Sequence, residues 1–182
     1  MLLKSKFMKS LLVVNYPTIS TNDFAWIQNI RKEYDELNFT AIEPHFTLVF
    51  PLINIDQSTL ISHVKQSIQA IQSFEFTLRC AVLSNDAFRD YTHVFLVPDE
   101  GYSKIVKLHD RLYREVLADE LRLDIPFIPH IGIANSLNIH SCKELVDRLN
   151  SQQFELRGRI DKLDIIWNKG DLVETVKSID LA

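Results

Sequence analysis

Two histidines far apart in the chain occur in the same local pattern. His45 lies in PHFTLVF, residues 44–50, and His130 lies in PHIGIAN, residues 129–135, so each follows a proline and precedes a run of apolar and small residues. Side chains alternate between the two faces of a strand, which places Thr47 on the face of His45 and Gly132 on the face of His130. Each pattern predicts a β-strand with one buried apolar face and one face that carries a histidine.

Two imidazoles that flank one substrate group suit in-line displacement at phosphorus. The attacking and leaving oxygens lie on opposite sides of the phosphorus, and each needs a proton transfer. An unperturbed pKa of about 6.5 allows one histidine to act as base and the other as acid near neutral pH. The hydroxyl of Thr47 can donate a hydrogen bond to a nonbridging oxygen. We therefore expect His45 and His130 to be catalytic, and Thr47 and Gly132 to face the substrate.

The elements that must position these histidines repeat along the chain. Each half reads strand, helix, histidine strand, helix, strand. The first half uses residues 10–17, 22–37, 44–50, 57–71 and a strand from 74, and the second uses 91–98, 102–119, 129–135, 141–149 and a strand from 154. Residues 160–167 and 172–181 add strands. We predict an α+β, bilobal fold in which two pseudo-symmetric antiparallel sheets face a central cleft, with helices outside.

Length and composition favour one compact domain. The chain has 182 residues, of which 46% are hydrophobic and 24% charged, enough to bury a substantial core. We expect a single domain over residues 8–182, made of lobes near 8–90 and 91–182 that can exchange strands, after an N-terminal extension at 1–7.

The paired His-x-(Thr/Ser)-apolar pattern, within this duplicated organisation, resembles the two-histidine (2H) phosphoesterases. These include bacterial RNA 2',3'-cyclic phosphodiesterases, also called 2'-5' RNA ligase-like proteins. The resemblance covers the chain from Met8 and implies a bilobal fold, a metal-free mechanism, and His45, Thr47 and His130 as active-site residues. Gly132 departs from the family pattern, which normally offers a hydroxyl at that position.

We therefore expect a metal-independent phosphodiesterase acting on a 2',3'-cyclic phosphate of an RNA end or a nucleotide. A second hypothesis keeps the fold but changes the substrate to another nucleotide-derived cyclic phosphate or a 2'-5' linkage. A third, motivated by Gly132, is a module that binds nucleotides or RNA ends without turnover.

Other features restrict the remaining classes. Ligand spacing typical of a metal site is absent, so we expect no metal and no cofactor. The net charge of −4 argues against a large nonspecific nucleic-acid surface. Cys80 and Cys142 are too few for a disulfide framework, and no apolar run approaches the length of a membrane span. We expect a cytoplasmic monomer with free thiols.

Further polar residues are weaker candidates. His93 and Tyr16 could approach the cleft from strand positions, whereas His63 and His109 are interpreted as solvated helix residues. Five basic residues could hold a substrate phosphate, with nothing in the sequence to select among them: Arg79, Arg89, Arg157, Arg159 and Lys169.

Overall fold

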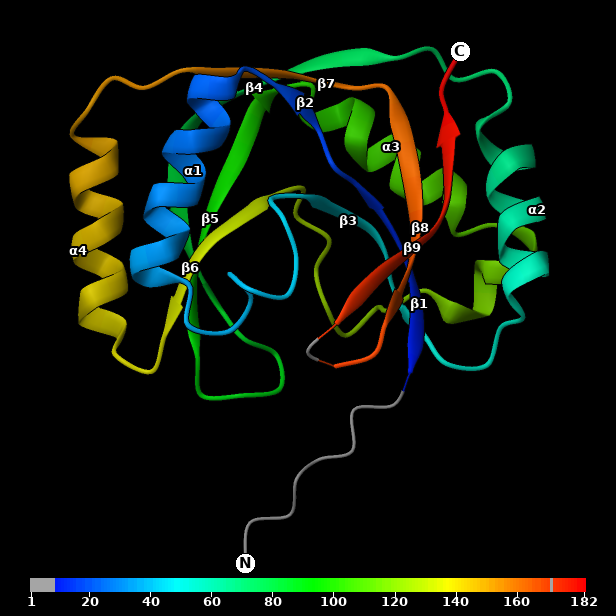
Figure 1. The fold of residues 1–182 in the computed structure, drawn as a ribbon, viewed down its shortest axis with the longest axis horizontal. Coiled ribbons are helices and arrows are strands. Elements are labelled where there is room, and N and C mark those ends of the chain that lie inside the picture. The colour runs from blue at the N-terminus through cyan, green and yellow to red at the C-terminus, as the bar shows by residue number, and fades with distance from the viewer. Residues whose placement is uncertain (1–8, 171) are drawn as a thin grey trace, which may run out of the picture.

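Two antiparallel sheets form the centre of the molecule, and helices flank them (Figure 1). The computed structural model describes residues 9–170 and 172–182. The predicted α+β architecture is confirmed. The expected extension at residues 1–7, and Met8 with it, lie outside the described residues. The strands are β1 Ser10–Asn15, β2 Thr18–Ile19, β3 Phe46–Leu52, β4 Phe74–Asn85, β5 Thr92–Glu100, β6 Ile131–Ser136, β7 Leu156–Ile160, β8 Lys162–Asn168 and β9 Val173–Asp180.

The sheets contain strands from both halves of the chain. The first sheet has the order β3-β1-β8-β9, and the second has the order β2-β7-β4-β5-β6. The strands β3 and β6, which directly follow the two histidines of the repeated pattern, are edge strands, and each pairs with the strand that opens its own half, β1 or β5. Next to each of these pairs lies a strand from the other half of the chain, because β8 pairs with β1 and β4 pairs with β5. This exchange links the two lobes covalently and through backbone hydrogen bonds.

The strands that open with a Phe-Glu pair in the sequence are not equivalent in the two sheets. β4 begins at Phe74, as expected, but β7 begins two residues after Phe154, at Leu156. The two strands are antiparallel neighbours in one sheet, with Phe74 opposite Ile160. Both strands that close the predicted repeat are present, but they join the same sheet, because the sequence of a short strand carries no information on which sheet it joins.

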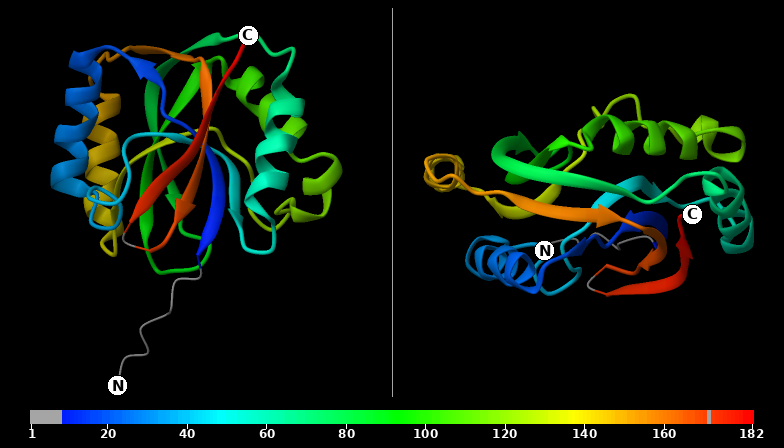
Figure 2. Two further views of the ribbon diagram at one scale, coloured as in Figure 1. Left: turned by 45° about the vertical axis from the view of Figure 1, so that its right-hand side comes forward. Right: turned by 90° about the horizontal axis from the view of Figure 1, so that it is seen from above.

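Within the described ranges, four α-helices flank the sheets: α1 Thr21–Tyr34, α2 Gln57–Ile68, α3 Tyr102–Leu112 and α4 Ile139–Asn150. Figures 1 and 2 show α1 and α4 together at one end of the sheets and α2 and α3 at the other. A hydrogen bond from Arg148 to the hydroxyl of Tyr34 joins the first pair. None of the helices in the described part of the chain is long and apolar enough to cross a membrane.

Helix boundaries differ from the sequence prediction where capping decides them. The side chain of Ser20 accepts a hydrogen bond from the amide of Asp23, so α1 begins one residue before Asn22. Gly101, with a φ of 83°, precedes α3. That helix ends at Leu112, and a separate 3₁₀ helix, Glu115–Glu120, replaces the rest of the predicted helix.

Pro98 lies inside β5 and does not end it. The strand continues to Glu100, with Pro98 opposite Leu78. β6 pairs with β5 only as far as Leu96, and the β4 pairing is irregular beside Pro98. A proline is tolerated where its missing amide would have no ladder partner or where a bulge interrupts the ladder.

Candidate active site

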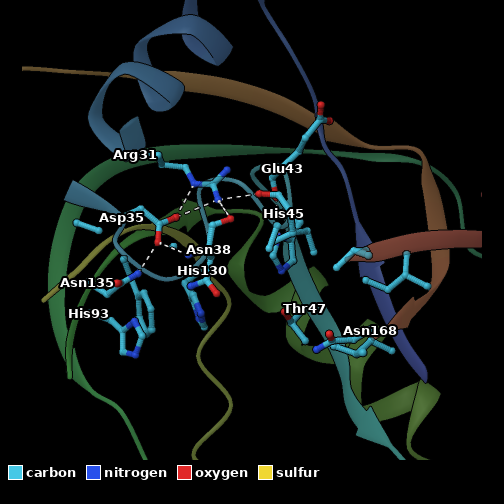
Figure 3. A pocket seen from close by; sticks show the side chains of 18 of the residues that line it. Arg31, Asp35, Asn38, Glu43, His45, Thr47, His93, His130, Asn135 and Asn168 are labelled. Atoms are coloured by element: carbon cyan, nitrogen blue, oxygen red, sulfur yellow. Dashed lines mark hydrogen bonds and ion pairs between the residues drawn. The ribbon is translucent and has the colours of Figure 1, made fainter. Parts of the chain in front are cut away.

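His45 and His130 lie in the same pocket, a cavity of about 300 Å³ between the two sheets (Figure 3). Each histidine immediately precedes its strand rather than lying within it, since β3 begins at Phe46 and β6 at Ile131. The prolines before them are buried, whereas both imidazoles are half-buried. The structure thus brings together the two histidines that the repeated sequence pattern identified.

Backbone carbonyls orient both imidazoles in the same way. Nδ1 of His45 donates to the carbonyl of Glu43 over 2.8 Å, and Nδ1 of His130 donates to the carbonyl of Ile128 over 2.6 Å. A carbonyl only accepts, so Nδ1 carries the proton in each neutral ring. The Nε2 atom of each ring is left to accept or release a proton in the pocket.

Burial makes both rings weaker bases than a solvated histidine. It lowers the pKa of His45 to about 4, and Arg31 lowers it further against the raising effects of the Glu43 hydrogen bond and Asp35. Burial likewise lowers the pKa of His130 to about 4, with smaller contributions in the same direction from His45 and His93. Both imidazoles are therefore neutral near pH 7 when the pocket holds no anion. An anionic group between them would favour the charged form and raise both pKa values.

Thr47 and Gly132 also line this pocket. Gly132 pairs with Phe95 of β5, and a Cβ built on Gly132 would lie 4.0 Å from Cε1 of Phe95. Apart from Gly132 and its two chain neighbours, no other atom of the described residues lies within 4 Å of that position. Steric crowding therefore does not require a glycine at position 132.

The second histidine stacks on an aromatic column that the sequence indicated only in part. The ring of Phe95 lies flat on His130 with centroids 3.6 Å apart, and His93 stacks on Phe95 at 5.6 Å. Nε2 of His93 lies 3.0 Å from a carboxylate oxygen of Asp86. His93 lines the pocket, whereas Tyr16 contacts His45 edge-on at 6.1 Å from outside the pocket lining.

A buried polar network supports the first histidine, and the sequence reasoning missed it. Arg31 is 2% exposed and forms an ion pair with Asp35, the residue that caps the C-terminal end of α1. The same guanidinium donates to the carbonyls of Asn38 and Ile42, in the loop that leads to His45. Arginine and aspartate four residues apart on a helix usually form a solvated pair. The burial of this pair comes from the loop that folds over it.

The same network reaches the strand of the second histidine. The side-chain amide of Asn135, on β6, donates to Asp35, and its carbonyl oxygen accepts from the amide of Leu37. All three residues of the Arg31–Asp35–Asn135 network line the pocket (Figure 3). The network therefore connects the two segments that carry His45 and His130.

The basic residues considered from sequence lie elsewhere. None of Arg79, Arg89, Arg157, Arg159 and Lys169 is among the described residues that line the pocket. Arg79, for example, forms ion pairs with Asp99, Glu100 and Glu155.

Two other histidines correct the sequence interpretation. His63 and His109 are 5% and 3% exposed, and their rings hydrogen-bond the carbonyls of Leu112 and Leu48. Helical periodicity does not show which polar residue finds a buried partner, so the sequence does not distinguish these two histidines from solvated ones.

Cys80 is half-buried and Cys142 buried, and both are free thiols. Among the residues that the structure describes, no group of three or more His, Cys, Asp or Glu side chains is arranged to hold a metal ion.

The sequence of this chain is similar to those of known proteins. The family model of the 2'-5' RNA ligase superfamily matches residues 19–172. A protein of Geobacillus sp. (strain WCH70), provisionally named a phosphoesterase, is 25% identical over 152 residues, 84% of each chain.

Solved structures show the same fold. TT0787 of Thermus thermophilus has a TM-score of 0.61 at 14% identity over 94% of this chain and 97% of that one. Escherichia coli LigT complexed with 3'-AMP has a TM-score of 0.60 at 12% identity over 96% and 98%. Since the family model covers most of the sequence, including both histidine segments, the chain belongs to the 2'-5' RNA ligase superfamily of two-histidine phosphoesterases.

Proposed function

We propose that this chain is a metal-independent phosphodiesterase that hydrolyses a 2',3'-cyclic phosphate at an RNA end or on a nucleotide, and that it acts as a cytoplasmic monomer. Membership in the superfamily supports a phosphoric diester hydrolase in general. The observation that carries the finer proposal is the matched pair of imidazoles, each with Nδ1 on a backbone carbonyl and Nε2 left for one shared pocket.

In the proposed reaction, one Nε2 takes a proton from water as the water oxygen bonds to phosphorus. The other imidazole, protonated at Nε2, gives its proton to the ribose oxygen as the P–O bond breaks. The product is a phosphomonoester, and exchange of protons with solvent restores the starting states. The two histidines are so similarly placed that either can take either role.

The pocket suits a nucleotide in size and lining. Its volume of about 300 Å³ is at the small end of ligand sites. Leu12, Ile166 and Val173 supply apolar walls from the first sheet, and the Thr47 hydroxyl offers a donor for a phosphoryl oxygen. The solved relative LigT was crystallised with 3'-AMP, which supports a nucleotide as the ligand class.

Hydrolysis of a nucleoside 2',3'-cyclic phosphate and of a cyclic-ended oligonucleotide, each with EDTA present, tests the proposal. We expect turnover to persist in the chelator. Loss of turnover that a divalent cation restores would contradict the acid-base assignment. Comparing kcat/KM for these substrates with kcat/KM for 2'-5' diesters and other nucleotide-derived cyclic phosphates shows which phosphodiester the enzyme prefers.

Gly132 favours one rival, a module that binds nucleotides without turnover, because the second segment lacks the hydroxyl that Thr47 supplies in the first. Tight nucleotide binding with no hydrolysis of any of these diesters would support that rival.

A further inference from the structure

A second hollow, of about 560 Å³, lies beside α3 and shares no lining residue with the pocket of His45 and His130. Its lining residues come from α3, the turn after it, and the segment that joins α2 to β4. Ala70 and Ile71 contribute apolar surface, and four basic side chains gather around it: Lys104, Lys107, Arg111 and Arg114. We call this hollow the α3 groove.

The basic side chains of the α3 groove follow one line. Lys104, Lys107 and Arg111 occupy helix positions i, i+3 and i+7, which share a face of the helix. At 1.5 Å per residue they span about 10 Å, and Arg114 extends the row past the end of α3. All four residues are exposed. The opposite face of α3 is buried through Ile105, Leu108 and Leu112.

These four cations form no ion pair with a carboxylate in the part of the chain that the structure describes. The ion pairs formed within the described residues involve none of them. Arg111 instead donates to the carbonyl of Ser67, and the ammonium of Lys104 lies 5.7 Å from the ring centre of Phe74. Asp110 is the acidic residue among the described lining, so positive charge dominates the groove. Arg79, which meets three carboxylates, shows how this chain neutralises a surface cation elsewhere.

We propose that the α3 groove binds the phosphate backbone of a single-stranded RNA, so that the protein holds a polymer at a place separate from its catalytic pocket. The choice of RNA rests on the proposed function. An RNA strand presents one negative charge per nucleotide along a line, which matches the row of cations, and its sugars and bases can cover Ala70 and Ile71. Such a contact is electrostatic and independent of base sequence.

Fluorescence anisotropy with a labelled single-stranded RNA 12-mer that ends in a 3'-hydroxyl tests this groove without any catalytic step. Four phosphate contacts predict a slope of about −2.8 when log K is plotted against log salt concentration. Lys107→Glu/Arg111→Glu should weaken binding by at least about tenfold at low salt and reduce the magnitude of the slope by at least about 1.4, since two contacts are lost.

Lys32→Glu/Lys177→Glu is the matched control, because both of these lysines are exposed, lie outside the groove lining and give the same change in net charge. It should retain most of the affinity. Equal losses in the two double variants would mean that net charge alone attracts RNA, and the groove proposal would fail. Lys107→Gln/Arg111→Gln repeats the test without added negative charge if the first variant does not fold, as judged by circular dichroism.

The remaining outcomes separate this proposal from the proposed enzyme activity. Binding of the 12-mer that depends on the groove, in a protein that hydrolyses no diester, would leave the groove standing and overturn the hydrolase. Hydrolysis of cyclic nucleotides, together with RNA binding that the groove variants do not change, would overturn the groove proposal and leave the hydrolase standing. An oligoglutamate peptide that binds as tightly as RNA, with the same salt slope, would overturn the assignment to nucleic acid.

Discussion

The segments around His45 and His130 share the geometry of the imidazole but differ in what surrounds it. In both, a buried proline precedes the histidine and a carbonyl two residues earlier holds Nδ1. The first segment adds the Thr47 hydroxyl and a buried polar network. The second has Gly132 and a stacked phenylalanine. The two segments thus share the features that fix the proton-transfer atom, whereas the supports behind each ring differ.

The largest expected effect comes from the support of the first segment. Arg31→Met leaves Asp35 buried without its cationic partner and releases the loop carbonyls that the guanidinium holds. Removal of one member of a buried ion pair destabilises a protein by about 3–5 kcal/mol. We expect urea unfolding to show a loss of that size.

Phe95→Leu is the counterpart in the second segment and removes stacking while keeping an apolar side chain, so its effect on unfolding should be smaller, about 1–2 kcal/mol. A smaller loss for Arg31→Met than for Phe95→Leu would show that the two supports are not ranked as we infer.

The next effect tests the shared geometry itself. His45→Ala and His130→Ala should each lower kcat by about 10²-fold or more, since each removes one proton-transfer group. His140→Ala, at an exposed position in α4, is the control and should leave kcat unchanged. Steady-state hydrolysis of a cyclic nucleotide measures all three. A variant of either pocket histidine that keeps most of its activity would mean that one imidazole suffices.

The location of these histidines was largely predictable, whereas their supports were not. The proline-histidine pattern and strand alternation placed His45, Thr47, His130 and Gly132 on cleft-facing positions, and all four line one pocket. Arg31 was not predictable, because its burial depends on a loop whose path follows no sequence period. The sheet membership of β4 and β7 was not predictable for a related reason, since strand pairing is decided by contacts distant in sequence.

A third prediction concerns pH and both segments together. Burial lowers the pKa of His45 and of His130 to about 4 in the folded protein, against about 6.5 in an unfolded chain. Between these values the unfolded state binds more protons, so this contribution to stability is complete above about pH 6.5 and is lost as the pH falls to about 4. Since both rings are partly solvated, we expect a total loss of about 1–3 kcal/mol.

Urea unfolding from pH 7.5 to 4.5 measures this loss, and His45→Gln/His130→Gln should make the profile flatter. His109, whose pKa burial also lowers, is present in both proteins and its effect cancels. Parallel profiles for the two proteins would show that the pocket histidines titrate normally.

The pH dependence of the reaction rate supplies a second measurement. A bound phosphate raises the pKa of neighbouring imidazoles. The bell-shaped profile of kcat, which reports the substrate complex, should therefore be centred at higher pH than the profile of kcat/KM, which reports the free enzyme.

The smallest effect addresses the sharpest difference between the two segments, Thr47 against Gly132. Gly132 does not have a positive φ, and a Cβ there meets only Phe95 Cε1, at 4.0 Å, so a β-branched residue suits the strand. Gly132→Thr should therefore not destabilise the fold. If the missing hydroxyl limits the reaction, the new donor should raise kcat by up to about tenfold, within the range of one oxyanion contact.

Gly132→Val separates the hydroxyl from the added bulk, because valine has nearly the shape of threonine without its donor. A rise with threonine and none with valine would assign the gain to the hydrogen bond and make the two segments functionally alike. A fall in kcat/KM with both would mean that glycine leaves space for the substrate beside Phe95. In that case Thr47→Val should still lower kcat, since the first segment would be the one that supplies a side-chain hydroxyl to the phosphoryl group.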